Sequence, residues 1–237
     1  MNTKQHTSQR YNNELAAIRS QLMTMGRLVE TQVTDAIKAL IEKDNPLAQK
    51  VFSSDHEINA LEMLLDDLCA EAIARRQPAA VDLRLLVAVI KVITDLERIG
   101  DEARKIGYYA ADVSQGVMPS DSLNVDLRHL GEHVKIMLHG ALDAFERLDV
   151  PQALQVALSD RRIDAEFNAL ERQLFSRMME DANNIGYSLN VLRYARSLER
   201  IGDHAKNVCE YVIYLVEGRD VRHTNLEKIH NELTTVR

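Results

Sequence analysis

The sequence contains few of the residues that interrupt helices. Among its 237 residues there are nine glycines, four prolines and no tryptophan, and aromatic residues make up 5%. Glycine and proline dominate tight turns, so their scarcity argues against a fold of many short strands and favours long helices with short connections. The small aromatic content, beside a hydrophobic content of 46%, predicts a core that is mainly aliphatic.

Other absences limit the setting and the function. No run of about 18 apolar residues is present, so no segment is expected to span a membrane. The two cysteines, Cys69 and Cys209, show no paired spacing, and residues 1–9 lack the apolar core of a signal peptide. The net charge of -7 opposes sequence-independent binding of nucleic acid, which needs a basic surface. We therefore expect a cytoplasmic protein with reduced thiols that binds no nucleic acid.

Apolar residues recur at helical spacing along most of the chain. Steps of four and three alternate most regularly through Leu85, Val89, Val92, Leu96, Ile99, Ala103 and Ile106. Such spacing is typical of a helix that packs in a bundle. The same reasoning predicts six long helices, over about residues 8–44, 45–76, 79–114, 121–149, 151–181 and 187–218. Asn45 is expected to cap the second helix and Pro46 to lie in its first turn.

The second half of the chain repeats the first. The hexapeptide Leu96–Asp101 returns letter for letter as Leu198–Asp203, 102 residues later, and the Asp-x-Pro turn at residues 44–46 returns 105 residues later at 149–151. The architecture that fits is all-α: a tandem repeat of two three-helix bundles, made of six long antiparallel helices. Each bundle is expected to bury its own apolar seam, and the two bundles to lie end to end or side by side.

The repeat divides the chain into four parts. We expect a flexible tail over residues 1–8, the first three-helix bundle over 9–115, the second over 120–218, and a polar C-terminal tail over 219–237. Turn residues between Gly116 and Pro119 separate the two bundles. The C-terminal tail is expected to contain one short helix, around residues 226–233.

Each hexapeptide places two acidic residues on one helix face beside the apolar seam. Glu97 and Asp101 are four residues apart, and so are Glu199 and Asp203. Side chains at that spacing are neighbours, and their like charges repel. A bound cation would compensate them, and carboxylate oxygens suit hard ions. We therefore consider these four residues as ligands of divalent or iron-type metal ions, with magnesium, manganese, calcium, iron and zinc as candidates.

The glycine inside each hexapeptide, Gly100 or Gly202, costs about 1 kcal/mol of helix stability against alanine. A locally unfavourable residue that occurs twice indicates a close approach, either of a neighbouring backbone or of a ligand. Further polar residues at helical spacing can complete a metal site: Asp55, Asn59, Glu62 and Asp66 in the second helix, and Asp160, Asp164 and Glu171 in the fifth.

A salt-bridge network is the alternative explanation of the same charges. A charged helix edge is the commonest role of residues in this arrangement. The pairs within reach are Arg98 with Glu102, Asp101 with Arg104 or Lys105, Arg196 with Glu199, and Lys206 with Asp203. The spacing alone leaves both explanations open.

The sequence contains no recognisable motif of an enzyme. It has no nucleophile elbow, no phosphate-binding glycine loop and no redox cysteine pair. His129 and His133 share a helix face but lack the acid of a zinc-protease motif, and the single Glu227-x-x-His230 falls short of the two that a di-iron bundle needs. We therefore predict no catalytic residue. The alternatives are a carboxylate-bridged metal enzyme and a metal-binding helical scaffold.

Three motifs, in order along the chain, resemble the PhoU family, the accessory proteins of bacterial high-affinity phosphate uptake. They are residues 19–26 (RSQLMTMG), residues 74–84 (ARRQPAAVDLR) and the paired LERIGD hexapeptides. The resemblance extends from about Tyr11 to Arg222. It implies a tandem pair of three-helix bundles and a metal-binding E(D)-x-x-x-D motif in each.

The metal motif of the family falls on Glu97 and Asp101 in the first half and on Glu199 and Asp203 in the second. Family members hold multinuclear iron clusters in some cases and other divalent ions in others. The halves differ just after the motif, where Glu102 of the first corresponds to a histidine in the second. The resemblance therefore implies two metal sites that need not bind equally.

The resemblance also implies a function in the cytoplasm. Family members act as negative regulators of the phosphate-starvation response and restrain phosphate uptake when phosphate is plentiful. They are thought to be adaptors between the sensor histidine kinase and the ATPase and permease subunits of the phosphate ABC transporter. They act at the inner face of the membrane without spanning it, and they are often homodimers.

Overall fold

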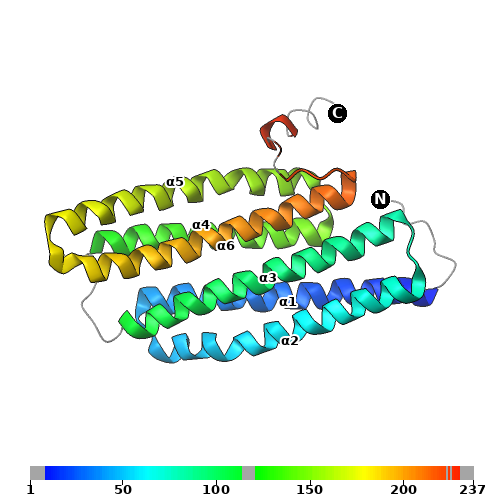
Figure 1. Cartoon of the computed structure of the whole chain (residues 1–237), viewed down its shortest axis with the longest axis horizontal. Helices are drawn as coiled ribbons and strands as arrows, with labels where there is room; N and C mark the ends of the chain where they lie inside the picture. Colours follow the sequence, from blue (N-terminus) through cyan, green and yellow to red (C-terminus); the bar gives the residue numbers. More distant parts are fainter. Residues whose placement is uncertain (1–8, 114–120, 223, 225, 230–237) are drawn as a thin grey trace.

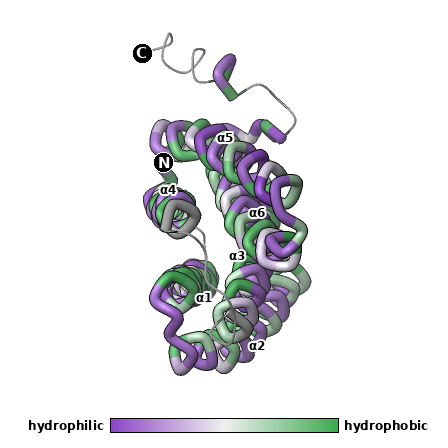
Figure 2. Tube along the Cα trace, turned by 90° about the vertical axis from the view of Figure 1, so that its left-hand side faces the viewer, coloured by the Kyte–Doolittle hydropathy of each residue, from purple (hydrophilic) through white to green (hydrophobic). Residues whose placement is uncertain are grey.

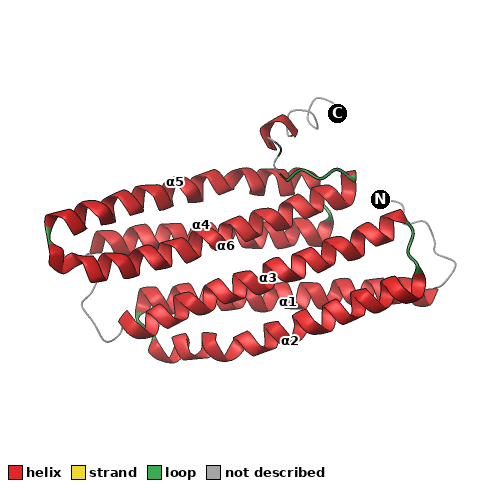
Figure 3. Cartoon of the chain, viewed as in Figure 1, coloured by secondary structure: helices red, strands yellow, loops and turns green. Residues whose placement is uncertain are grey.

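The computed structural model of the chain describes residues 9–113, 121–222, 224 and 226–229, and these residues form helices and connecting loops with no strand (Figure 3). Six of the helices are long: α1 (Gln9–Glu42), α2 (Asn45–Arg76), α3 (Ala80–Val113), α4 (Asp121–Arg147), α5 (Val150–Glu180) and α6 (Ile185–Glu217). A short 3-10 turn, η1 (Ala182–Asn184), joins the last two. The predicted tail at residues 1–8 lies outside the described residues. The predicted all-α fold with six long helices is confirmed.

The two groups of three helices lie side by side along their length (Figure 1). Seen end on, α4, α5 and α6 form one group and α1, α2 and α3 the other (Figure 2). Helix α3 packs along α6, and α1 packs more lightly along α4. The buried side chains of both groups form one continuous apolar core. The apolar seam of each bundle is buried, as expected, and the two seams join where α3 packs along α6.

The second helix of each group begins in the same way. The carboxylate of Asp44 accepts a hydrogen bond from the backbone N–H of Leu47 at 3.0 Å, and that of Asp149 accepts one from Gln152, also at 3.0 Å. A proline follows in the first turn of each helix. Asp44 is therefore the cap of α2, and the prediction that Asn45 would cap it is corrected. An aspartate one residue earlier is better placed to reach the free N–H groups of the first turn.

Helices α1 and α4 approach each other through a reciprocal pair of contacts. A Cβ added to Gly26 would lie 2.9 Å from Cδ2 of Leu142, and one added to Gly131 would lie 2.9 Å from Cγ2 of Ile37. The two glycines are 105 residues apart, as are Ile37 and Leu142. The two repeats therefore present the same surface to each other, as the subunits of a two-fold dimer do.

The last described residues cover the outside of the second group. Val221, Leu226 and Ile229 are buried although they follow the end of α6. Residues 226–229 form a helical turn, which agrees with the start of the predicted short helix. The rest of that helix lies outside the described residues. A segment expected to be a polar tail thus holds three apolar side chains against the bundle.

Candidate metal sites and the contact between the repeats

The first acidic cluster lies between α2 and α3. Glu97 and Asp101 project from α3 beside Asp55 of α2. Oδ1 of Asp101 accepts a hydrogen bond from Nη2 of Arg104 at 2.9 Å, and Nε of the same arginine lies 3.5 Å from Oδ2 of Asp55. One guanidinium therefore bridges acids of two helices. The predicted pairing of Asp101 with Arg104 is confirmed.

The pKa values of this cluster show that its acids interact. Partial burial raises the pKa of Glu97, and the charges of Asp101, Glu62 and Asp55 add to the effect. Burial also raises the pKa of Glu62, followed by the charges of Asp66 and Asp101. Carboxylates raise one another's pKa only when they are close together. Of the acids predicted in the second helix, Asp55 and Glu62 are thus beside the hexapeptide acids.

The second acidic cluster lies between α5 and α6 and is more deeply buried. Asp160 is 2% exposed and Glu199 is 9% exposed. Oδ2 of Asp160 accepts a hydrogen bond from Nζ of Lys206 at 2.7 Å, and Oε1 of Glu199 accepts one from Nη1 of Arg196 at 3.0 Å. The predicted pair of Arg196 and Glu199 is confirmed. Lys206, however, pairs with Asp160 of α5 and not with Asp203 of its own helix.

Three carboxyl groups of the second cluster also have raised pKa values. Burial raises the pKa of Asp164, with the charges of Asp160 and Asp203 next in size. Burial raises the pKa of Glu199, followed by the charge of Asp203. Asp203 is exposed as a residue, but its carboxyl group is partly buried. That burial raises the pKa of Asp203, and the charge of Asp160 raises it further. Glu171, by contrast, has no contact in the described structure that ties it to this cluster.

Both clusters contain carboxylate oxygens that suit a cation. Oδ1 of Asp55, Oδ1 of Asp160 and Oε2 of Glu199 are buried and accept no hydrogen bond. A buried oxygen without a donor is destabilising, and a hard cation beside it would remove that cost. In the described structure no three acidic, histidine or cysteine side chains converge closely enough to hold a metal. Arg104 and Lys206 compensate the acids instead. The four hexapeptide acids thus remain predicted metal ligands.

The glycines of the hexapeptides serve helix packing. A Cβ on Gly100 would lie 3.1 Å from Oε1 of Gln32 and 3.4 Å from Cδ1 of Ile58. A Cβ on Gly202 would lie 3.1 Å from Cδ1 of Ile163, which is the repeat counterpart of Ile58. The close approach expected at these positions is therefore that of a neighbouring side chain, and not of a backbone or a ligand.

The contact between the repeats contains buried polar residues that the sequence analysis missed. Asp95 of α3 is 5% exposed. Its Oδ1 lies 2.7 Å from Nδ1 of His204 and accepts a hydrogen bond from Nδ2 of Asn207 at 3.0 Å, both from α6. In the sequence, the sign of this contact was the position of Asp95, directly before the seam residue Leu96. Asp95 therefore ties the first repeat to the second.

A second polar contact crosses the same interface. Glu102 is 4% exposed and pairs with Nζ of Lys105 at 2.9 Å and with Nη1 of Arg200, from the other repeat, at 3.2 Å. The predicted partner was Arg98, four residues earlier on the same helix. Glu102 is buried against α6, whereas Arg98 is exposed to solvent. The charge of Glu102 is therefore compensated by one cation of its own helix and one from the other repeat.

Comparison with known proteins matches both repeats to one protein family. The family model described as "PhoU domain" matches residues 22–110 and 127–212, one stretch in each repeat. The phosphate-specific transport system accessory protein PhoU homolog of Pseudomonas putida is 49% identical over 229 residues, which are 96% of this chain and 89% of that protein.

Two solved structures share the architecture. The crystal structure of PhoU from Pseudomonas aeruginosa superposes with a TM-score of 0.85 at 48% identity and covers 88% of this chain and 100% of that one. The phosphate transport system regulatory protein PhoU from Streptococcus pneumoniae superposes with a TM-score of 0.81 at 27% identity, over 89% of this chain and 99% of that one. Both similarities extend over both repeats.

Proposed function

The chain belongs to the PhoU family, and on that premise we propose that it is an accessory protein of a bacterial phosphate transport system. It acts in the cytoplasm as a negative regulator of the phosphate-starvation response and restrains phosphate uptake when phosphate is plentiful. The observation that carries the proposal is the 49% identity over 96% of the chain to a protein named for that system. The similarity includes both repeats, so it concerns the whole architecture.

We propose an adaptor without catalysis. Its partners are the sensor histidine kinase and the ATPase and permease subunits of the phosphate ABC transporter, which it meets at the inner face of the membrane. No described helix has a stretch apolar enough to cross a bilayer. The two repeats give one molecule two related but unequal acidic faces, which suits contact with two different partners. We also propose that two copies associate as a homodimer.

The acidic faces are the proposed metal sites. Glu97 and Asp101 would hold an ion with help from Asp55 and Glu62, and the unpaired oxygen of Asp55 supports this. In the second repeat, the ligands would be Glu199, Asp203, Asp160 and Asp164. Magnesium, manganese, iron and zinc are the candidate metals. A bound cation supplies positive charge that neutralises the acids, and it would thereby shape a docking surface.

The proposed regulatory role is tested by deleting the gene. In phosphate-rich medium, wild-type cells are expected to keep alkaline phosphatase repressed, whereas the deletion strain should express it. A plasmid with the wild-type chain should restore repression. A deletion strain that represses the enzyme normally would refute the role.

The role of the acids is tested in the same strain with the variant Glu97→Gln, Asp101→Asn, Glu199→Gln and Asp203→Asn. The proposal predicts a loss of repression and a weaker pull-down of the kinase and transporter from phosphate-rich cells. A matched control replaces four exposed acids outside the clusters: Glu42, Glu57, Glu71 and Glu132. If both variants restore repression fully, the hexapeptide acids are only surface charge.

A further inference from the structure

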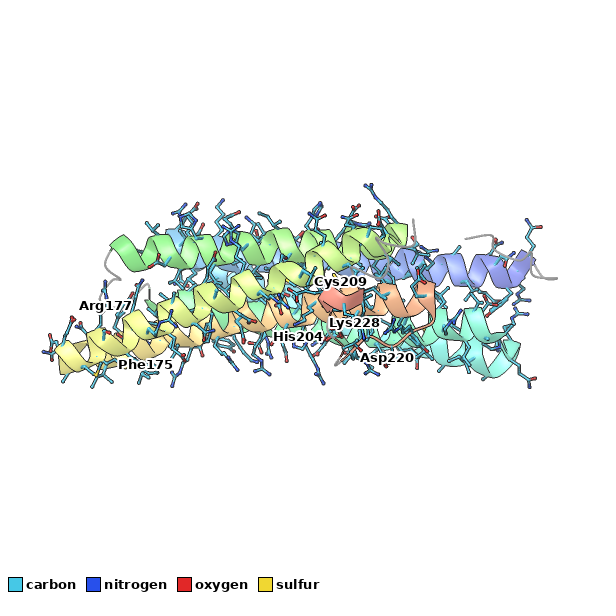
Figure 4. The ribbon with its side chains drawn as sticks, turned by 90° about the horizontal axis from the view of Figure 1, so that it is seen from above. Phe175, Arg177, His204, Cys209, Asp220 and Lys228 are labelled. Atoms are coloured by element: carbon cyan, nitrogen blue, oxygen red, sulfur yellow. The ribbon has the colours of Figure 1, made fainter. Side chains whose placement is uncertain are left out.

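The second repeat contains a groove lined by several cationic side chains. It lies between α5, α6 and the segment that follows α6, and its volume is about 630 Å³. Pockets of roughly 300–1,000 Å³ are the usual size of small-molecule sites. Figure 4 shows the helical turn that carries Lys228 and the loop that carries Asp220 beside the part of α6 that carries His204 and Cys209. The C-terminal segment therefore forms one wall.

Cationic side chains dominate the groove. Arg161 comes from α5, Arg200 and Lys206 from α6, and Arg222 from the C-terminal segment. His204 and Asn207 add further polar groups, and the carboxylates among the described lining residues are Asp203 and Glu210. Each of the four cations also pairs with an acid, so the groove offers an anion several N–H donors and not a net positive charge.

Each of these cations pairs with a carboxylate of the protein. Arg222 donates from Nε to Oδ1 of Asp220 at 3.0 Å, and Arg161 pairs with Glu227. Arg200 and Lys206 are oriented by Glu102 and Asp160, as described above. A guanidinium has five N–H donors and an ammonium three, so each cation keeps donors for a ligand. These pairs favour orientations that point the cations along the groove, which lowers part of the entropic cost of binding.

Apolar side chains also line the groove: Ala157 and Leu158 of α5 and Leu226 of the C-terminal segment. A ligand that fills the groove therefore has an anionic part that meets the cations and an uncharged part that covers these apolar side chains. Arginine and lysine in a cluster suit an anion with several acidic oxygens, because the planar fork of arginine can bind two oxygens at once.

We propose that this groove binds a small phosphoryl-bearing molecule. Its phosphoryl oxygens contact Arg161, Arg222 and Lys206, and its organic part lies against Leu158 and Leu226. The shared chemistry allows two sources, free phosphate and a phosphate ester, and the size of the groove favours the ester. This site adjoins the proposed metal site of the second repeat, because Asp203 lines the groove and Lys206 pairs with Asp160, but it needs no metal and goes beyond the proposed regulatory role.

Calorimetry on the full-length chain in buffer with EDTA and constant chloride tests the proposal. The probes are ADP, inorganic phosphate, adenosine and citrate. We expect saturable binding of one ADP per chain, binding of phosphate weaker by about tenfold, and no binding of adenosine. Absence of saturable binding by ADP and phosphate would overturn the proposal. Tighter binding of citrate than of ADP would overturn the ligand class. EDTA removes metal, so a failure of the metal sites leaves this result intact.

Variants locate the binding. Arg161→Gln with Arg222→Gln is expected to weaken ADP binding by about tenfold or more. The matched control is Arg172→Gln with Arg193→Gln, two exposed arginines of α5 and α6 outside the groove. Equal weakening by both double variants would show diffuse attraction and overturn the site.

A third variant distinguishes direct binding of the ligand by Arg161 from the anchoring of the C-terminal segment by the same arginine. Glu227→Gln breaks the same ion pair as Arg161→Gln but keeps the arginine. We expect it to bind ADP at least as tightly as the wild type. A loss equal to that of Arg161→Gln alone would assign the effect to the anchoring of the segment and contradict direct contact with the ligand. Unchanged circular dichroism of each variant confirms that it is folded.

Discussion

The two acidic clusters arise from identical hexapeptides, yet their surroundings differ. In the first, Arg104 lies across two helices and shares its charge between Asp101 and Asp55. In the second, the acid of the neighbouring helix is almost fully buried and is compensated by Lys206 alone in an ion pair of 2.7 Å. Asp55 and Asp160 are repeat counterparts, as are Arg104 and Lys206, so the pairing itself is repeated. The surroundings are not, since Glu62 of α2 corresponds to the apolar Phe167 of α5, and Glu199 is buried where Glu97 is only partly buried.

The difference in burial gives the largest predicted effect. Lys206→Met leaves the carboxylate of Asp160 buried without its partner, and we expect a loss of about 3 kcal/mol in the free energy of unfolding. Arg104→Met is expected to cost about 1 kcal/mol, because the arginine and Asp101 are both more than one-third exposed and solvent screens them.

Urea denaturation of both variants measures these losses. Combining Lys206→Met with Asp160→Asn is expected to recover most of the stability, since the uncompensated charge is gone. Equal losses in the two single variants would show that the clusters are energetically alike and would break the comparison.

The contact between α1 and α4 should, in contrast, respond alike on both sides. Gly26→Ala and Gly131→Ala each place a Cβ 2.9 Å from a side chain of the other repeat. We expect each to lower the free energy of unfolding by about 1–2 kcal/mol, because the partner must move out of its place. Gly186→Ala is the control, since no atom lies within 4 Å of its Cβ position. Thermal unfolding of the three variants measures the effect, and a clear inequality between Gly26→Ala and Gly131→Ala would contradict the two-fold relation.

Metal binding should sharpen the contrast between the clusters. An ion in the second site competes with Lys206 for Asp160, so Lys206→Met is expected to bind Mn²⁺ there about tenfold more tightly. Calorimetry with Mn²⁺ measures this in a background of Glu97→Gln and Asp101→Asn, which removes the first site. Glu199→Gln and Asp203→Asn, added as a control, should abolish the gain. Unchanged affinity in Lys206→Met would show that the lysine and the ion do not share a site.

The smallest effect concerns pH. A carboxyl group with a raised pKa in the folded state binds protons more readily than in the unfolded state, so stability falls as pH rises through the folded pKa. The loss begins above the ordinary values of 3.8 for Asp203 and 4.5 for Glu199. Since Asp203 is exposed, we expect less than about 1 kcal/mol between pH 5 and pH 7.

The two clusters can be compared by removing their acids in pairs. Glu199→Gln with Asp203→Asn should flatten the dependence of the urea midpoint on pH more than Glu62→Gln with Glu97→Gln. The reason is that three acids of the second cluster, and two of the first, have raised pKa values. A rise of stability from pH 5 to pH 7 that both pairs leave unchanged would show that other groups dominate.

The features of the site that could be predicted from the sequence are those that a single helix determines. The spacing of Glu97 and Asp101 placed them on one face, and the repeat placed Glu199 and Asp203 equivalently. Ion pairs within a helix, such as Arg196 with Glu199, were predicted for the same reason. The prediction failed where the actual partner is on another helix: Lys206 pairs with Asp160 of α5 and not with Asp203.

The sequence by itself determined the six helices, their repeat and the face on which each hexapeptide acid lies. Those properties follow from local periodicity and turn residues, which act over a few positions. The tertiary structure alone decided that Lys206 meets Asp160, that Asp95 meets His204, and that the C-terminal segment lines a cationic groove. These contacts depend on the rotation and register of packed helices, which the whole core fixes together.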